Sequence, residues 1–144
     1  MAADRIAVAR QFLGVPFLHQ GRDPAVGVDC VGLGVLYLRA LGFDVRDRKD
    51  YGRDPDGSLR GELVRVLGEP AAEGRGCVSA ARPGDILSLR YAHIGAAPER
   101  HVAIASELYG RPAMIHADSH HKRVVEIPLD ARWQRRVIGV WRVA

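Results

Sequence analysis

The sequence predicts an α+β fold in which N-terminal helices pack on a C-terminal antiparallel sheet of about five strands. In the first half of the 144-residue chain, apolar residues recur with the spacing of amphipathic helices. After Pro83 this spacing gives way to short alternating or β-branched runs separated by turn residues. No repeat, low-complexity tract or linker interrupts the chain, so we expect one domain over residues 1–144.

Two helices and one loop are predicted in the first part of the chain. The segment Ala3–Leu13 has helical spacing and is followed by Val15–Asp29, an ordered loop with several glycines and prolines. The second helix is Cys30–Leu41. Gly32 and Gly34 would each cost this helix up to about 1 kcal/mol relative to alanine. We therefore expect the helix to pack closely at these glycines against another element, the sheet.

The middle and C-terminal parts complete the pattern. Phe43–Pro55 is a charged loop, and Asp56 or Ser58 can cap a third helix that runs to Leu67. One helical turn is expected within Pro128–Gln134, before the last strand. The predicted strands are Gly84–Tyr91, His101–Glu107, Ala113–Asp118, Arg123–Ile127 and Val137–Val143.

Composition and charge argue against a nucleic-acid-binding protein, a membrane-spanning protein and a protein with a signal peptide. The 21 basic and 17 acidic residues give a net charge of +4, a mild bias towards anionic partners such as cell-wall polymers. The basic residues are scattered, so we expect a solvated surface and no nucleic-acid partner. No stretch approaches the roughly 20 apolar residues of a membrane span. Asp4, Arg5 and Arg10 interrupt the N-terminal segment, so we expect no signal peptide and synthesis in the cytoplasm.

Cys30 stands where the polar loop runs into the second helix. At a helix N-terminus, the macrodipole and the unpaired backbone N–H groups favour the thiolate. The sequence therefore predicts a reactive Cys30, although a lone cysteine in an apolar helix is more often a core residue. Cys77 precedes no helix and is expected to be passive. A disulfide between the two cysteines is the alternative.

Two isolated histidines occupy strand positions further along the chain. Alternation places His101, Ala103 and Ala105 on one face of a strand. The hairpin that follows turns the chain antiparallel, so His116 is expected within about two residues of facing His101. We expect the helix of Cys30 to pack on the face that carries both histidines. The three side chains would then form a Cys-His-His relay, whereas a lone strand histidine is more often structural.

The other histidines do not predict a metal centre. Neither His-Glu-x-x-His nor Cys-x-x-Cys spacing occurs, so we expect neither a metal nor another cofactor. His120 and His121 are expected at a solvent-exposed turn. Trp133 and Trp141 are expected in the core or at its rim.

Four motifs follow one another in an order that is typical of one group of cysteine peptidases. They are Asp29-Cys30-Val31-Gly32-Leu33, Arg82-Pro83-Gly84-Asp85-Ile86, His101-Val102-Ala103-Ile104 and Ile115-His116-Ala117. With these motifs, nearly the whole chain resembles the NlpC-type peptidases of the papain-like superfamily, which cut peptidoglycan stem peptides. The branch encoded by tailed phages and gene transfer agents is the most similar, through Gly14-Val15-Pro16-Phe17-Leu18-His19-Gln20, Val124–Leu129 and Trp133–Arg136.

The resemblance implies roles for individual residues. The nucleophile of the family falls on Cys30, its general base on His101 and its orienting polar residue on His116. Asp29 is implied as a residue that binds substrate or positions the loop. As an N-terminal helix cap, Asp29 would have a structural role instead.

Two departures from the family pattern concern the substrate site. The aromatic residue before the cysteine is usually a tyrosine whose hydroxyl can support the oxyanion, and Phe17 has no hydroxyl. His19 or Gln20 is the nearest side chain that could replace it. Phe17, His19 and Gln20 are therefore candidates for substrate binding. Val31 replaces a serine that helps some relatives to bind a free amine, which argues against a preference for a free substrate N-terminus.

The resemblance implies a cysteine endopeptidase that acts without metal or cofactor. Its expected target is the amide between γ-D-glutamyl and diaminopimelate residues in peptidoglycan stem peptides. Carriage in the tail of a phage or gene transfer agent particle, among other tail proteins, would bring it to the cell wall and periplasm. The alternatives are a structural tail-tip protein with a vestigial site, and an amidase or acyltransferase on the same fold.

Overall fold

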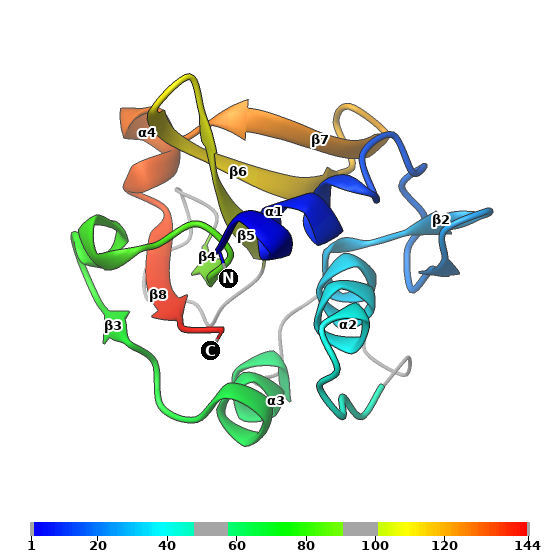
Figure 1. Cartoon of the computed structure of the whole chain (residues 1–144), viewed down its shortest axis with the longest axis horizontal. Helices are drawn as coiled ribbons and strands as arrows, with labels where there is room; N and C mark the ends of the chain where they lie inside the picture. Colours follow the sequence, from blue (N-terminus) through cyan, green and yellow to red (C-terminus); the bar gives the residue numbers. More distant parts are fainter. Residues whose placement is uncertain (1, 48–57, 91–100, 144) are drawn as a thin grey trace.

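The computed structural model describes residues 2–47, 58–90 and 101–143 and has the predicted α+β architecture (Figure 1). The helices are α1 (Ala2–Arg10), α2 (Cys30–Ala40), α3 (Ser58–Leu67), the 3-10 turn η1 (Cys77–Ala80) and α4 (Ala131–Gln134). The strands are β1 (Arg22–Asp23), β2 (Gly27–Val28), β3 (Ala72–Glu73), β4 (Ile86–Leu89), β5 (His101–Leu108), β6 (Arg111–Asp118), β7 (Arg123–Pro128) and β8 (Val137–Trp141). None of the described helices is long and apolar enough to cross a membrane.

The large sheet is antiparallel throughout, with the strand order β3-β8-β4-β5-β6-β7. The five predicted strands correspond to β4–β8, and β3 adds a two-residue strand at one edge. The predicted loop Val15–Asp29 contains a small β1–β2 hairpin. The strands β1, β2 and β3 were not predicted, because two residues are too few to show the alternation by which a strand is recognised in a sequence. Ser58 begins α3, and Asp56, the other proposed cap, lies outside the described residues.

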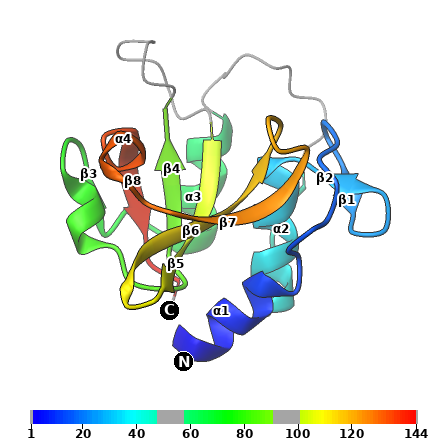
Figure 2. The ribbon, with the colours of Figure 1, turned by 90° about the horizontal axis from the view of Figure 1, so that it is seen from above.

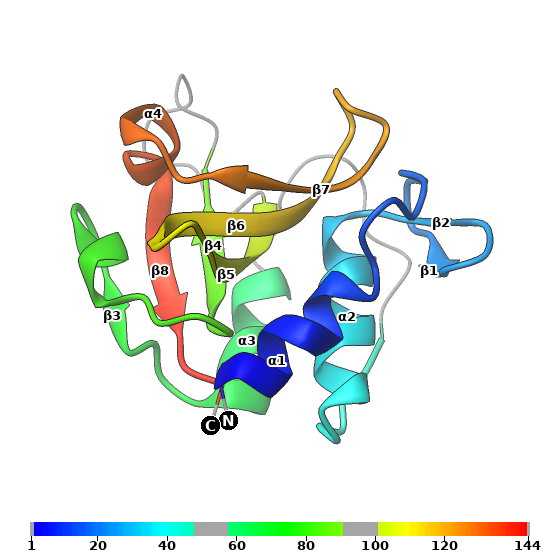
Figure 3. The same cartoon turned by 45° about the horizontal axis from the view of Figure 1, so that its top comes forward.

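The sheet separates two apolar cores. On one face, Val102, Ile104 and Ile115 pack with Leu33 and Tyr37 of α2, and Figure 3 shows α1 beside α2 on this side. On the other face, the alanines of β5 pack in a second core with η1 and α4. Figure 2 shows α2 and α4 on opposite sides of β5 and β6. The first six residues of β5 are consequently all buried.

The ends of α2 follow from local capping. Asp29 has an extended backbone, and its Oδ1 accepts a hydrogen bond from the Gly32 N–H at 2.8 Å. This contact satisfies one of the N–H groups that a helix start leaves unpaired. At the other end, Gly42 adopts the left-handed region (φ +94°), and the Phe43 N–H bonds to the Leu38 carbonyl at 3.0 Å. This glycine-dependent cap stops the helix.

The Gly84–Asp85 turn joins α2, the sheet and the C-terminal segment. The Tyr37 hydroxyl donates to the Gly84 carbonyl at 2.6 Å, and the Ala105 N–H donates to the Asp85 carbonyl at 2.8 Å. The buried Asp85 carboxylate accepts two hydrogen bonds, each 3.1 Å, from Nε of Arg142. The motif Arg82-Pro83-Gly84-Asp85-Ile86 therefore connects these elements and has a structural role.

The two glycines of α2 have different neighbours. A Cβ on Gly32 would collide with the carbonyl oxygen of Gly21, in the loop before β1. A Cβ on Gly34 would meet only Cγ2 of Val102, at an ordinary 3.8 Å. The expectation that both glycines lie against the sheet is correct for Gly34 and wrong for Gly32, which allows the loop to reach the helix start.

We predict opposite effects for the two Gly→Ala changes in α2. Gly32→Ala should reduce the free energy of unfolding by about 2 kcal/mol or more, because a backbone carbonyl must move. Gly34→Ala should be neutral or stabilise by up to about 1 kcal/mol, since alanine favours the helix and space is available. Urea unfolding of both variants measures the difference, and equal destabilisation would contradict the assignment.

Candidate active site

The histidines of β5 and β6 form a direct hydrogen bond. His101 Nε2 and His116 Nδ1 are 2.8 Å apart, and the ring planes are nearly perpendicular, at 84°. The backbone register begins with Ile104 opposite Ile115, and its continuation places His116 opposite Ala103, two residues from His101. The sequence prediction of their relative positions is confirmed.

Cys30 opens α2, and its sulfur lies at the start of β5. The backbone amides of Val102, Val31 and Cys30 itself favour the thiolate and so oppose a rise of the thiol pKa. Val102 follows His101 in β5, so the thiol reaches the strand end from which the histidine projects. Cys30 is half-buried, and both cysteines are free thiols, so the disulfide alternative is wrong.

The prediction that α2 packs on the face that carries the histidines is wrong. The helix packs on the face of Val102 and Ile104, and alternation sends His101 and His116 to the other face, below α4. The reason is steric, because β-branched residues offer more surface to the helix than the alanines of β5. Cys30 therefore meets the histidine strand at its end and not across its face.

Burial keeps the thiol and both imidazoles uncharged. It raises the pKa of Cys30 to about 11, against the three backbone amides. It lowers the pKa of His101 to about 3, with a further contribution from His116, and that of His116 to about 4. The thiol pKa is raised and not lowered as expected at the helix start, because desolvation and the Asp29 charge outweigh the backbone amides that favour the thiolate. At neutral pH Cys30 is therefore a thiol and both imidazoles are neutral.

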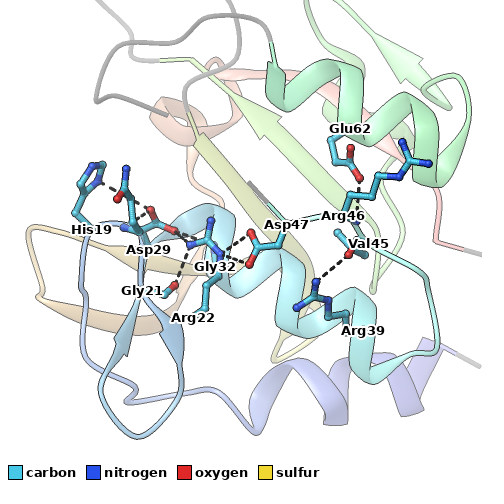
Figure 4. A network of polar contacts seen from close by, with 11 residues as sticks. His19, Gly21, Arg22, Asp29, Gly32, Arg39, Val45, Arg46, Asp47 and Glu62 are labelled. Atoms are coloured by element: carbon cyan, nitrogen blue, oxygen red, sulfur yellow. Dashed lines mark hydrogen bonds and ion pairs between the residues drawn. The ribbon is translucent and has the colours of Figure 1, made fainter. Parts of the chain in front are cut away.

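Asp29 is the centre of a buried polar network (Figure 4). Its Oδ1 accepts from the Gly32 N–H and from Nη1 of Arg22 at 3.1 Å, and its Oδ2 accepts from the Gln20 N–H at 2.8 Å. Nε of Arg22 also donates to Asp47 at 2.8 Å. Asp29 is thus a helix cap that holds the preceding loop, and a contact with substrate remains a prediction.

The other candidates for substrate binding lie in this loop. Nδ1 of His19 is 4.0 Å from Oδ2 of Asp29, and Gln20 has a left-handed backbone (φ +61°) that turns its N–H towards the same carboxylate. Phe17 is half-buried and packs against the core on the α2 side, with its N–H bonded to the Lys122 carbonyl at 2.9 Å. His19 and Gln20 gather at the helix start, whereas Phe17 is a packing residue. Their contact with substrate stays a prediction.

Other parts of the described chain offer no equivalent chemistry. A cavity of about 240 Å³ lies at the far end of β5, between Ser106, Pro112 and Leu129, and no cysteine or histidine of the described residues lines it. Within the same ranges, no three acidic, cysteine or histidine side chains are arranged to hold a metal ion. Cys77 is buried, and its Sγ lies 3.7 Å from the Val137 carbonyl, as expected of a passive thiol.

Two neighbours of the histidine pair were not among the predicted site residues. The Asp118 carboxylate acts against burial by raising the pKa of both His101 and His116, and it also contacts Nδ1 of the exposed His121. The rings of Trp133 and His116 pack edge to face, with centroids 5.3 Å apart. Counting along the hairpin places Asp118 opposite His101, so the register could have identified it. No local pattern identifies Trp133, which comes from another element.

The comparisons with known proteins agree with this geometry. The sequence pattern of the NlpC/P60 family matches residues 14–142. No curated protein matches the chain.

Solved structures share the fold. An NlpC/P60 family protein from Bacillus cereus has a TM-score of 0.68 and 23% identity over 99% of this chain, which spans 40% of that protein. The NlpC/P60 domain of the peptidoglycan hydrolase SagA has a TM-score of 0.61 and 23% identity, with 99% of both chains covered. An N-acetylmuramoyl-L-alanine amidase from Bacteroides uniformis has a TM-score of 0.56 and 14% identity, with 97% of this chain and 96% of that chain covered.

We predict that the histidine pair makes the protein acid-sensitive. Both folded pKa values lie below the unfolded value near 6.5, so the stabilisation is complete above that pH and is lost as the pH falls towards 4. When the pH falls from 7 to 4.5, the free energy of unfolding of His116→Asn should therefore fall by about 2 kcal/mol less than that of the wild type. Urea unfolding at both pH values measures this, with His120→Asn at the exposed turn as control. Equal losses in wild type and His116→Asn would refute the assignment.

Cys30 should react with iodoacetamide about tenfold faster than Cys77 between pH 6 and pH 9, because Cys77 is buried. The rate at Cys30 should climb over this whole range, since burial raises the thiol pKa to about 11. Peptide mass spectrometry of timed samples gives both rates. A plateau below pH 7 would show instead that a thiolate–imidazolium pair is present at rest.

Proposed function

The chain belongs to the NlpC/P60 family, and from this we propose that it is a cysteine endopeptidase that hydrolyses the stem peptides of peptidoglycan. The proposed bond is the amide between γ-D-glutamyl and diaminopimelate residues. The observation that carries the proposal is the His101–His116 hydrogen bond, next in β5 to Val102, whose backbone favours the Cys30 thiolate. A nucleophile, a base and a group that orients the base are the three parts of such a mechanism.

The first half of the reaction forms an acyl-enzyme. The thiol proton of Cys30 moves to Nδ1 of His101 while the sulfur attacks the carbonyl carbon. His116 accepts the Nε2–H of His101, which leaves Nδ1 as the basic atom. The imidazolium then gives its proton to the departing amine nitrogen as the C–N bond breaks, and a thioester remains on Cys30.

The second half releases the product. Water transfers a proton to His101 and attacks the thioester carbonyl, and the proton returns to sulfur as the C–S bond breaks. In both halves the oxyanion develops near the start of α2. The Gly32 N–H there donates to the Asp29 carboxylate, whereas the N–H groups of Cys30 and Val31, the first two of α2, have no backbone acceptor within the helix. The amides of Cys30 and Val31 are therefore the proposed oxyanion donors.

The wider context of the proposal is a virus-like particle. The Gly14–Gln20 segment and the C-terminal motifs support a role in the tail of a phage or gene transfer agent, from which the enzyme would act on the cell wall. The net charge of +4 suits a polymer that is rich in carboxylates. Neighbouring tail proteins are the proposed partners.

We predict that the purified protein releases soluble fragments from sacculi and that Cys30→Ala abolishes this. The loss should be about a thousandfold or more, because the nucleophile is removed. Cys77→Ala is the matched control, since it removes a buried thiol on the opposite side of the sheet and should retain activity. Mass analysis of the released muropeptides identifies the bond that is cut.

The fragment ends distinguish the alternatives. New diaminopimelate amines and γ-glutamyl carboxylates support the endopeptidase, whereas peptides freed from muramic acid would identify an amidase. If wild type and Cys30→Ala are equally inert, the chain is a structural tail protein with a vestigial site.

A further inference from the structure

We propose that Trp133 is a positioning residue that selects the tautomer of His116, and through it the tautomer in which His101 is a base towards Cys30. This role in catalysis rests on the proposed function, whereas the tautomers themselves do not. The observations that carry the proposal are the edge-to-face packing of the Trp133 and His116 rings and the buried Nε2 atom of His116.

Counting protons shows why a tautomer must be selected. Two neutral imidazoles share one proton between His101 Nε2 and His116 Nδ1. If His101 donates it, Nδ1 of His101 is a free base and His116 carries its proton on Nε2. If His116 donates it, His101 carries its own proton on Nδ1 and cannot accept one from Cys30. Only the first arrangement is productive.

The environment of His116 Nε2 decides between the two arrangements. This atom is buried, and the described part of the chain gives it no hydrogen-bond partner. The Trp133 ring approaches His116 at 71°, with centroids 5.3 Å apart. In the proposed arrangement the Nε2 edge of His116 faces the indole, whose π face accepts an N–H and repels a lone pair and so favours the protonated Nε2. Trp133 thus supports the productive tautomer.

Arg136 holds the Trp133 ring in place and helps to keep the histidine pair neutral. Its guanidinium carbon lies 4.8 Å from the centre of the Trp133 ring, and its charge helps to lower the pKa of His101. A cation on the tryptophan holds the ring in place by a cation–π contact and opposes a second positive charge nearby. Trp133 and Arg136 together therefore hold the pair neutral and correctly protonated.

The direct test is nitrogen NMR of histidine-labelled protein at pH 7, without substrate. We expect the wild-type His101 and His116 both to carry the proton on Nε2. Trp133→Leu should move His116 towards the Nδ1-protonated form, and Trp133→Phe, which retains a π face, should largely restore the wild-type spectrum. The proposal is overturned if His116 of the wild type is protonated on Nδ1, or if Trp133→Leu leaves the tautomer of His116 unchanged. The wild-type spectrum provides this test even if one variant folds poorly.

Kinetics give the second readout. Trp133→Leu should lower kcat on muropeptides about threefold to tenfold with little change in KM, and Trp133→Phe should recover most of it. In a His116→Asn background the same change should have almost no effect, because an amide accepts the His101 proton without a tautomer choice. An equal loss in both backgrounds would mean that Trp133 is merely structural. If the wild type cuts no peptidoglycan while the tautomers are as expected, the proposed function fails and the tautomer assignment stands.

Discussion

The carboxylate of Asp29 is the contact on which the geometry of the site depends. One oxygen caps α2 through the Gly32 N–H and accepts from Arg22, while the other holds the backbone of Gln20. This arrangement fixes where the helix begins and therefore where Cys30 stands. Since Gly32 has no side chain, the loop can approach the helix closely enough for these contacts. The cap, the glycine and the nucleophile are thus one local unit.

The second requirement is a strand end at which the two sides of the sheet meet. β5 is covered by α2 on one face and by η1 and α4 on the other. The Cys30 thiol therefore lies on one side of the sheet and the two imidazoles on the other. The backbone ladder between β5 and β6 stops at Ile104 and Ile115, and the His101–His116 bond continues the connection beyond it. A sheet covered on only one face would leave one of these groups in water.

Burial has a definite consequence for the chemistry. Desolvation disfavours both the thiolate and the imidazolium, so the resting pair is neutral. A neutral pair holds the same number of protons as an ion pair, and the charges need to separate only during the reaction. Backbone amides around the sulfur and the carboxylate of Asp118 near the imidazoles are in place to stabilise those charges.

The sequence alone determined the features that depend on short stretches of chain. The capped start of α2 at Cys30 and the register of His101 and His116 follow from residues that are close together in sequence, or that are joined by one tight hairpin. The tertiary structure alone decided which face α2 covers, which loop Gly32 accommodates, and that Trp133 lies against His116. It also decided the direction of the Cys30 pKa shift, because desolvation is summed over elements that are distant in the chain and leaves no local pattern.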